Sequence, residues 1–147
     1  MKENQNQINH DVWSGCEYTN TINNIQYISD GFQVNPSTLW SKIGETSIHL
    51  TTTISNAQSM MLHRQNFNQN TILTATISIL HTKGELLKLR INESSNIFTE
   101  VTIPVSSSPQ EISVTRQILA TGYVSINIVS VSDTEEAYLD NIRLTTS

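Results

Sequence analysis

The feature that most constrains the fold of this chain is the alternation of apolar and polar residues with a period of two. Stretch 73–79 places an apolar residue at every second position, with threonine or serine between them. The same pattern recurs over 87–91, 97–103 and 124–128. Side chains alternate between the two faces of a β-strand, so each stretch predicts a strand with one buried face. No stretch sustains a period of 3.6, and we expect an all-β chain.

Clusters of Gly, Pro, Asn and Ser separate the predicted strands. Asp30-Gly31 predicts a turn or a bulge, and in all about eight to ten strands follow one another at the spacing of a two-sheet sandwich. After Ile128 the apolar positions change parity, which predicts a β-bulge near Ile128 and Val129. We expect two antiparallel sheets packed face to face, with a core that includes Leu73, Ile77, Leu89, Ile91, Val124, Ile126 and Leu144.

The first 15 residues lack this alternation. We therefore expect a flexible N-terminal arm or linker over 1–15 and one β-sandwich domain over 16–147. The polar start of the chain is not followed by an apolar segment of the kind found in signal peptides. We expect either export by another route or a chain that is part of a larger protein.

Composition narrows the partners of such a domain. Charged residues make up 14% of the chain and the net charge is −5, which argues against nucleic acid. No apolar run approaches the ~20 residues that span a bilayer, so we expect no membrane insertion. Cys16 is the only cysteine, which excludes an intrachain disulfide. Ser, Thr and Asn account for 51 of 147 residues, and their uncharged polar groups suit neutral hydrogen-bonding ligands.

The segment 137–144 predicts a closing strand that carries a carboxylate among apolar residues. Strict alternation places Tyr138, Asp140, Ile142 and Leu144 on one face. A carboxylate taken out of water needs compensation, so Asp140 requires a cation, an Arg or backbone N–H groups. A bound calcium ion and a set of backbone donors both meet this requirement.

Three segments carry a resemblance to a known family. Trp40 is followed at 44–50 by Gly-Glu-Thr-Ser-Ile-His-Leu, similar to a Gly-x-x-Ser-Leu-x-Leu strand. Segment 70–77 is similar to a second family strand, and 138–144 is close to a closing Tyr-x-Asp-Asp/Asn-Val/Ile-x-Leu strand. In these segments the chain resembles the cellulase-type carbohydrate-binding modules, which include xylan- and glucan-binding families. The resemblance implies a jelly-roll β-sandwich of the galactose-binding-like type.

The resemblance also implies a structural calcium ion (Ca²⁺) near the first strand. Asp140 matches the closing-strand aspartate that often helps to hold it. The family's second ligand is often the glutamate of a Phe-Glu pair before the tryptophan, and here Phe32-Gln33 and Cys16-Glu17 are the choices. Glu17 keeps the carboxylate that calcium favours. We therefore expect Asp140 and Glu17 as metal ligands, with an Asp140 bonded to backbone groups as the metal-free alternative.

Sugar binding requires hydrogen-bonding side chains and a flat aromatic face on one surface. The polar positions of the strands around 74–78, 86–92 and 123–129 predict such a surface. Any antiparallel sheet also has a solvated polar face, which is the alternative explanation. The candidate ligand-binding residues are Lys88, Arg90, Asn92 and Asn127 for hydrogen bonding, and Trp40 and Tyr27 for stacking.

No specific catalytic constellation is present in the sequence. The four histidines share no metal-ligand spacing, and no glycine-rich phosphate loop occurs, so we expect no enzyme. The leading hypothesis is a non-catalytic module that binds a neutral carbohydrate and forms part of an adhesin or a receptor-binding viral fibre. Its location would be extracellular, at a cell surface or on a virion. The alternative is a structural or protein-interaction domain in a homo-oligomer or larger assembly.

Overall fold

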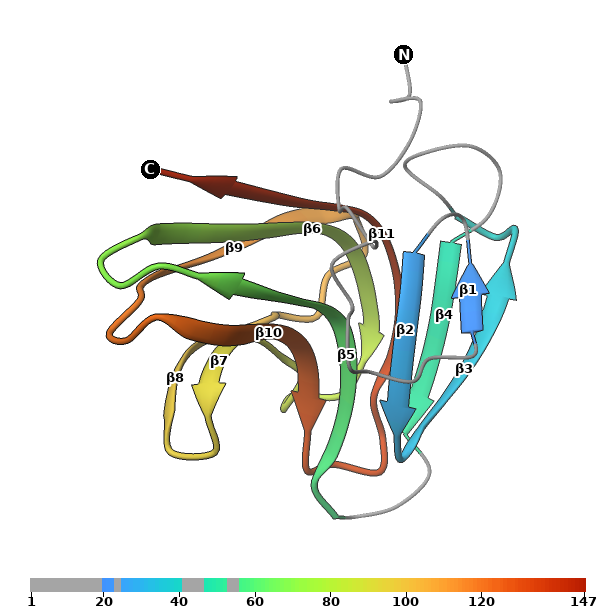
Figure 1. Ribbon diagram of the computed structural model, residues 1–147. Coiled ribbons are helices and arrows are strands. Elements are labelled where there is room, and N and C mark those ends of the chain that lie inside the picture. Colours follow the sequence, from blue (N-terminus) through green and yellow to red (C-terminus); the bar gives the residue numbers. More distant parts are fainter. Residues whose placement is uncertain (1–19, 23–24, 41–46, 53–55) are drawn as a thin grey trace.

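The computed structural model describes residues 20–22, 25–40, 47–52 and 56–147. Every regular element in these ranges is a β-strand, and none of the described residues forms a helix long and apolar enough to cross a membrane. Figure 1 labels the strands, which are β1 (Asn20–Ile22), β2 (Ile25–Asp30), β3 (Phe32–Ser37), β4 (Ser47–Thr52), β5 (Gln58–Phe67), β6 (Ile72–Lys83), β7 (Lys88–Ser94), β8 (Ile97–Thr102), β9 (Gln110–Gln117), β10 (Gly122–Ser130) and β11 (Glu136–Thr146).

The strands form two antiparallel sheets. One has six strands in the order β1-β2-β5-β10-β7-β8, and the other has five in the order β3-β4-β11-β6-β9. Neighbours within each sheet are mostly distant in sequence, as in β5 beside β10 and β4 beside β11 (Figure 1). The predicted all-β, two-sheet antiparallel sandwich is confirmed. Residues 1–15 lie outside the described residues, so the division of the chain at residue 16 stays a prediction.

The core lies between the two sheets. All but one of the predicted core side chains are at most 1% exposed, and Leu144 is partly buried against the same cluster. Ile77 comes from the five-stranded sheet and Leu89 from the six-stranded sheet, so both inner faces contribute. Burying each such side chain stabilises the fold by about 1.5–3 kcal/mol relative to leaving it in water.

Gly31 carries the chain from one sheet to the other. It is the single residue between β2, in the six-stranded sheet, and β3, in the five-stranded sheet. Its φ is 102°, a backbone conformation that glycine adopts without steric cost. A Cβ at this position would lie 2.6 Å from Cγ of Gln58. The predicted turn at Asp30-Gly31 is therefore confirmed as the corner of the sandwich.

Strand β10 does not contain the predicted bulge near Ile128 and Val129. Ile128 and Ser130 are buried while Val129 is partly exposed, so the alternation continues unbroken to the end of the strand. The register with β5 shifts instead between Ile126 and Asn127. The irregularity follows from an extra residue in the partner strand. Val129 therefore keeps the regular outward position of its strand. It borders a cavity on the outer face of the six-stranded sheet.

Strand β11 contains a bulge that the alternation did not predict. Its register against β6 shifts after Asp140, which pairs with Ser78, and Asn141 has a φ of 52°. Ile142 and Leu144 pack against the core, whereas Asp140 lies with Ser78 on the outer face of the five-stranded sheet. The prediction that Asp140 shares a face with Ile142 and Leu144 is therefore wrong, because the bulge reverses the alternation between them. Asp140 is nevertheless fully buried.

Candidate functional site

The outer face of the six-stranded sheet carries the row of polar side chains expected from the sequence. Lys88, Arg90 and Asn92 alternate along β7 with Leu89 and Ile91, which are fully buried in the core. The three polar residues therefore point away from the core. Antiparallel pairing with β10 sets Asn127 beside Arg90 on the same face. Three of these polar residues thus share one strand, and the fourth lies on its neighbour.

A cavity of about 410 Å³ opens on this face. It extends across β7, β10, β5 and the end of β2, and its wall includes Asp30, Gln58, Ser59, Leu86, Lys88, Arg90, Asn92, Ser95, Asn127, Val129 and Val131. The structure thus brings together Lys88, Arg90, Asn92 and Asn127, the four predicted hydrogen-bonding residues. The wall combines polar groups with aliphatic side chains, the composition typical of small-ligand sites.

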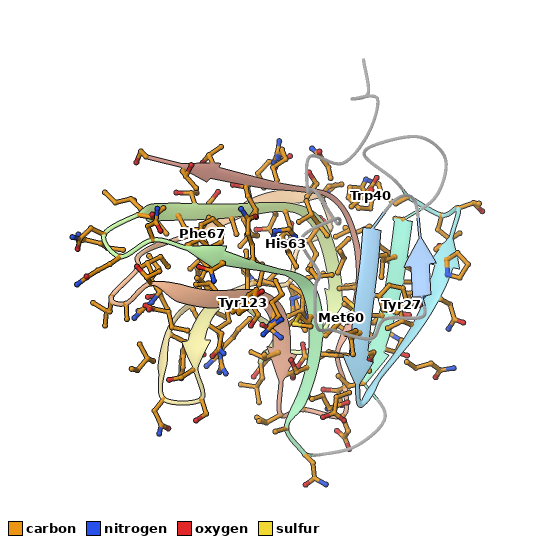
Figure 2. All side chains as sticks on the ribbon, viewed as in Figure 1. Tyr27, Trp40, Met60, His63, Phe67 and Tyr123 are labelled. Carbon is orange, nitrogen blue, oxygen red and sulfur yellow. The ribbon has the colours of Figure 1, made fainter. Side chains whose placement is uncertain are left out.

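The two predicted stacking residues do not line this cavity. Tyr27 belongs to the core cluster and is 6% exposed, and its burial raises the pKa of its hydroxyl. Its side chain points into the core because it alternates along β2 with that of Ile28, which is partly exposed. The expected place of Tyr27 on the ligand surface is therefore wrong. Trp40 is half-buried and lies in the half of the sandwich that holds β2 and β4 (Figure 2).

Asn127 is held in a chain of side-chain hydrogen bonds. Its Oδ1 accepts from the hydroxyl of Ser125 at 2.7 Å, and its Nδ2 donates to the hydroxyl of Ser59 at 3.0 Å. These bonds tie β10 to β5 and fix the orientation of the amide. An amide offers two N–H donors and two lone pairs, so Asn127 keeps one of each for a ligand.

Glu100 of β8 joins the two basic residues of the site. Its Oε2 lies 2.8 Å from Nζ of Lys88, and its Oε1 accepts from Nε and Nη2 of Arg90 at 3.0 and 2.6 Å. Burial by itself would raise the pKa of the Glu100 carboxyl, but the bonds from Lys88 and Arg90 outweigh it and lower the pKa. Glu100 is therefore a carboxylate at neutral pH. Asp30 contributes a second carboxylate to the cavity wall.

Two aromatic residues that were not among the predicted ligand-binding residues lie on the same sheet face. The guanidinium carbon of Arg90 lies 3.9 Å from the ring centroid of Phe98, a cation–π contact. Tyr123, near the start of β10, is 43% exposed, and the guanidinium carbon of Arg64 lies 3.8 Å from the centroid of the Tyr123 ring. The alternation over 97–103 puts Phe98 and Glu100 on the polar side of their strand. Only the register of β7 against β8 shows which residues they contact.

Of the two predicted metal ligands, Asp140 lies among the residues that the structure describes. Asp140 and Asn141 are fully buried, and both lie on the side of Ser78: Asp140 by strand pairing and Asn141 through Nδ2, 3.5 Å from the Ser78 hydroxyl. The Oδ1 of Asn141 makes no hydrogen bond with any described residue. Carboxylate and amide oxygens, which Asp140 and Asn141 carry, are ligand types that suit a hard cation such as calcium. Glu17 lies outside the described residues, and within them no three His, Cys, Asp or Glu gather as a metal site.

Comparison with solved structures identifies the architecture. The xylan-binding domain CBM22-1 from Paenibacillus barcinonensis Xyn10C superposes with a TM-score of 0.63 and 9% identity, over 82% of this chain and 85% of that chain. TmCBM61 in complex with β-1,4-galactotriose gives a TM-score of 0.55 and 14% identity, over 82% and 87%. The chain has the jelly-roll fold of carbohydrate-binding modules. A longer chain, the enzymatically active domain of bacteriophage CBA120 tailspike protein 4, matches over only 19% of its own length and 82% of this chain, with a TM-score of 0.62 and 12% identity.

The likeness to carbohydrate-binding modules is one of fold and not of sequence. The N-terminal cellulose-binding domain of β-1,4-glucanase C from Cellulomonas fimi, for example, is 12% identical, with a TM-score of 0.56 over 82% of this chain and 88% of that chain. No protein-family model matches the chain, and no curated protein matches its sequence. The predicted resemblance is therefore confirmed at the level of the jelly roll.

Proposed function

We propose that this chain is a non-catalytic carbohydrate-binding module whose ligand occupies the outer face of the six-stranded sheet. The observation that carries the proposal is the cavity of about 410 Å³ in which Lys88, Arg90, Asn92 and Asn127 converge. Their N–H groups and amide oxygens match the donors and acceptors of sugar hydroxyls. Aliphatic groups of Leu86 and Val129 offer contact to the apolar C–H faces of a sugar ring.

The charge balance of the cavity favours a neutral glycan. Lys88 and Arg90 both bond to Glu100, and Asp30 stands on the cavity wall. Two positive and two negative charges cancel, so the site exerts no net attraction on an acidic sugar. Hydroxyl groups, in contrast, bond to either kind of side chain.

The setting that we propose is an exported adhesin or a viral fibre at a cell surface or on a virion. The similarity to a domain of a phage tailspike supports this setting, as do the low charge and the Asn/Ser/Thr-rich composition.

We also propose that Asp140 and Asn141 contribute to a structural calcium site, supported by their buried oxygens. The ion would neutralise the buried carboxylate and tie β11 to neighbouring chain.

A glycan array followed by titration calorimetry tests the proposed binding. We expect at least one neutral glycan to bind, and Asn92→Ala to weaken that binding because it removes a donor and an acceptor from the cavity wall. Ser113→Ala, on the outer face of the other sheet, is the matched control and should bind as the wild type does. An array without neutral hits, or equal affinity of Asn92→Ala and wild type, contradicts the proposal.

Exposed apolar side chains favour a second candidate function, assembly into a larger particle. Leu86, Val105 and Val131 are 43%, 50% and 57% exposed. Leu86 borders both the cavity and a second depression that Val105 also lines. Light scattering distinguishes the two functions. Self-association through this region would give a particle mass that is a multiple of the chain mass, and Leu86→Ser should lower that particle mass.

A further inference from the structure

Glu100 is bonded to Lys88 and Arg90, the two cationic side chains of the candidate site to which an acidic sugar would otherwise bind. Both of its oxygens are engaged, one by Lys88 and one by Arg90. We propose that Glu100 is the residue that restricts the site to uncharged glycans. This inference rests on the proposed function and names the residue that sets its ligand class.

The geometry of Arg90 shows why one carboxylate has this effect. Guanidinium groups bind carboxylates and sulfates through pairs of N–H donors, and Nε and Nη2 of Arg90 both point to Oε1 of Glu100. An incoming anion would have to displace an internal carboxylate that is already bonded to both Lys88 and Arg90. It would also approach the negative charge of Glu100 itself, which opposes binding.

Removal of the Glu100 charge should leave the two cations in place. Arg90 also contacts the ring of Phe98, whose centroid lies 3.9 Å from the guanidinium carbon. Lys88 and Arg90 flank Leu89 on the same outward side of β7, which is fixed by its pairing with β10. The Glu100→Gln substitution keeps the shape of the side chain and an amide oxygen for Arg90. It thereby removes the carboxylate that both cations share and leaves the cavity with one excess positive charge.

The test compares binding of wild type and Glu100→Gln to heparin, a sulfated polysaccharide. We expect Glu100→Gln to bind heparin at low salt about tenfold more tightly than the wild type, since two partly exposed charges become available. The gain should disappear at about 0.5 M salt, where such charges are screened. Lys88→Gln in the Glu100→Gln background should reverse most of the gain.

Glu111→Gln is the matched control. It changes the net charge of the chain by the same amount and removes the ion pair between Glu111 and Arg143, but on the outer face of the five-stranded sheet. If Glu100→Gln and Glu111→Gln bind heparin equally, the gain reflects net charge alone and the inference is overturned. Wild-type binding as tight as that of Glu100→Gln overturns it as well. Thermal melts of each variant confirm that the folded proteins are compared.

Failure of the proposed function gives a different result. In that case the array shows no neutral ligand, whatever the heparin experiment shows. If neutral glycans bind and Glu100→Gln gains no heparin affinity, the site stands and Glu100 is not its charge filter. If neutral glycans bind and heparin affinity rises only in Glu100→Gln, both statements are supported.

Discussion

His81 and Glu135 meet in the interior, with Nε2 of the imidazole 2.8 Å from Oε1 of the carboxylate and neither side chain exposed. The Nδ1 of His81 lies 2.8 Å from the carbonyl oxygen of Ile103, which only accepts, so Nδ1 carries a proton. The second oxygen of Glu135 accepts from the backbone N–H of Leu86 at 3.1 Å. The pair therefore fixes the connection between β6 and β7, from which Leu86 reaches the cavity.

Glu135→Ala should destabilise the fold by about 3–5 kcal/mol, because it removes the partner of the fully buried His81 side chain and of the partly buried Leu86 N–H. Denaturation in urea measures the loss. Glu85→Ala, in the same connection but exposed, is the control and should change the stability by less than about 0.5 kcal/mol. Equal stabilities of the two variants would show that the buried pair is dispensable.

The hydrogen bonds of the Glu93 carboxylate predict that the protein loses folding stability in acid. It accepts from Nε of Arg116 at 2.7 Å and from the backbone N–H groups of Leu119 and Ala120. Burial alone would raise the pKa of Glu93, but the Leu119 N–H, the Arg116 side chain and the Ala120 N–H together hold the pKa below its usual 4.5. The carboxylate therefore stabilises the fold above the unfolded-state pKa, and this contribution is lost as the pH falls through the folded-state pKa.

The measurement is the unfolding free energy of wild type and Glu93→Gln from neutral pH to about pH 3. We expect the wild type to be more stable at neutral pH, with a gap that narrows in acid as Glu93 becomes protonated. A gap that stays constant over this range would mean that the charge of Glu93 does not contribute.

Leu89→Ala tests the position of the core. Leu89 is fully buried between the sheets, so the substitution should cost about 2–5 kcal/mol through lost contacts and a residual cavity. Leu119→Ala, at a position 59% exposed, should leave the melting temperature nearly unchanged. An unchanged melt of Leu89→Ala would contradict the packing of β7 against the other sheet.

Strand parity was sufficient to predict the sandwich and the outward direction of the polar side chains on β7. The alternation around Arg90 alone placed it on a solvated face, and the structure agrees. Parity failed where the backbone departs from a regular strand, since the bulge at Asn141 depends on a positive φ that a sequence pattern does not reveal. The burial of Tyr27 was not predictable from its place near a strand end, because which side of β2 faces the core depends on pairing with β5. Likewise, the bonds of Glu100 depend on the register of β7 and β8.

The calcium proposal predicts that metal and fold stability are linked through β11. An ion that binds only the folded state stabilises it by RT ln(1 + [L]/Kd), about 2.7 kcal/mol at a hundredfold excess over Kd. Chelation should therefore lower the melting temperature of the wild type. Asp140→Asn keeps the size of the side chain but removes the charge that a cation needs, so its melting temperature should not respond to chelator.

Asn141→Gly separates the role of the amide oxygen from that of the backbone. Glycine adopts the φ of 52° without strain, so the bulge is retained while the buried Oδ1 is removed. If that oxygen is a ligand, Asn141→Gly should need more calcium than the wild type to reach the same melting temperature, because one oxygen of the coordination shell is lost. Melts of the three proteins over a calcium titration decide the matter. A wild type that melts at the same temperature with calcium and with chelator excludes a stabilising ion, and the buried carboxylate of Asp140 must then be compensated by protein groups alone.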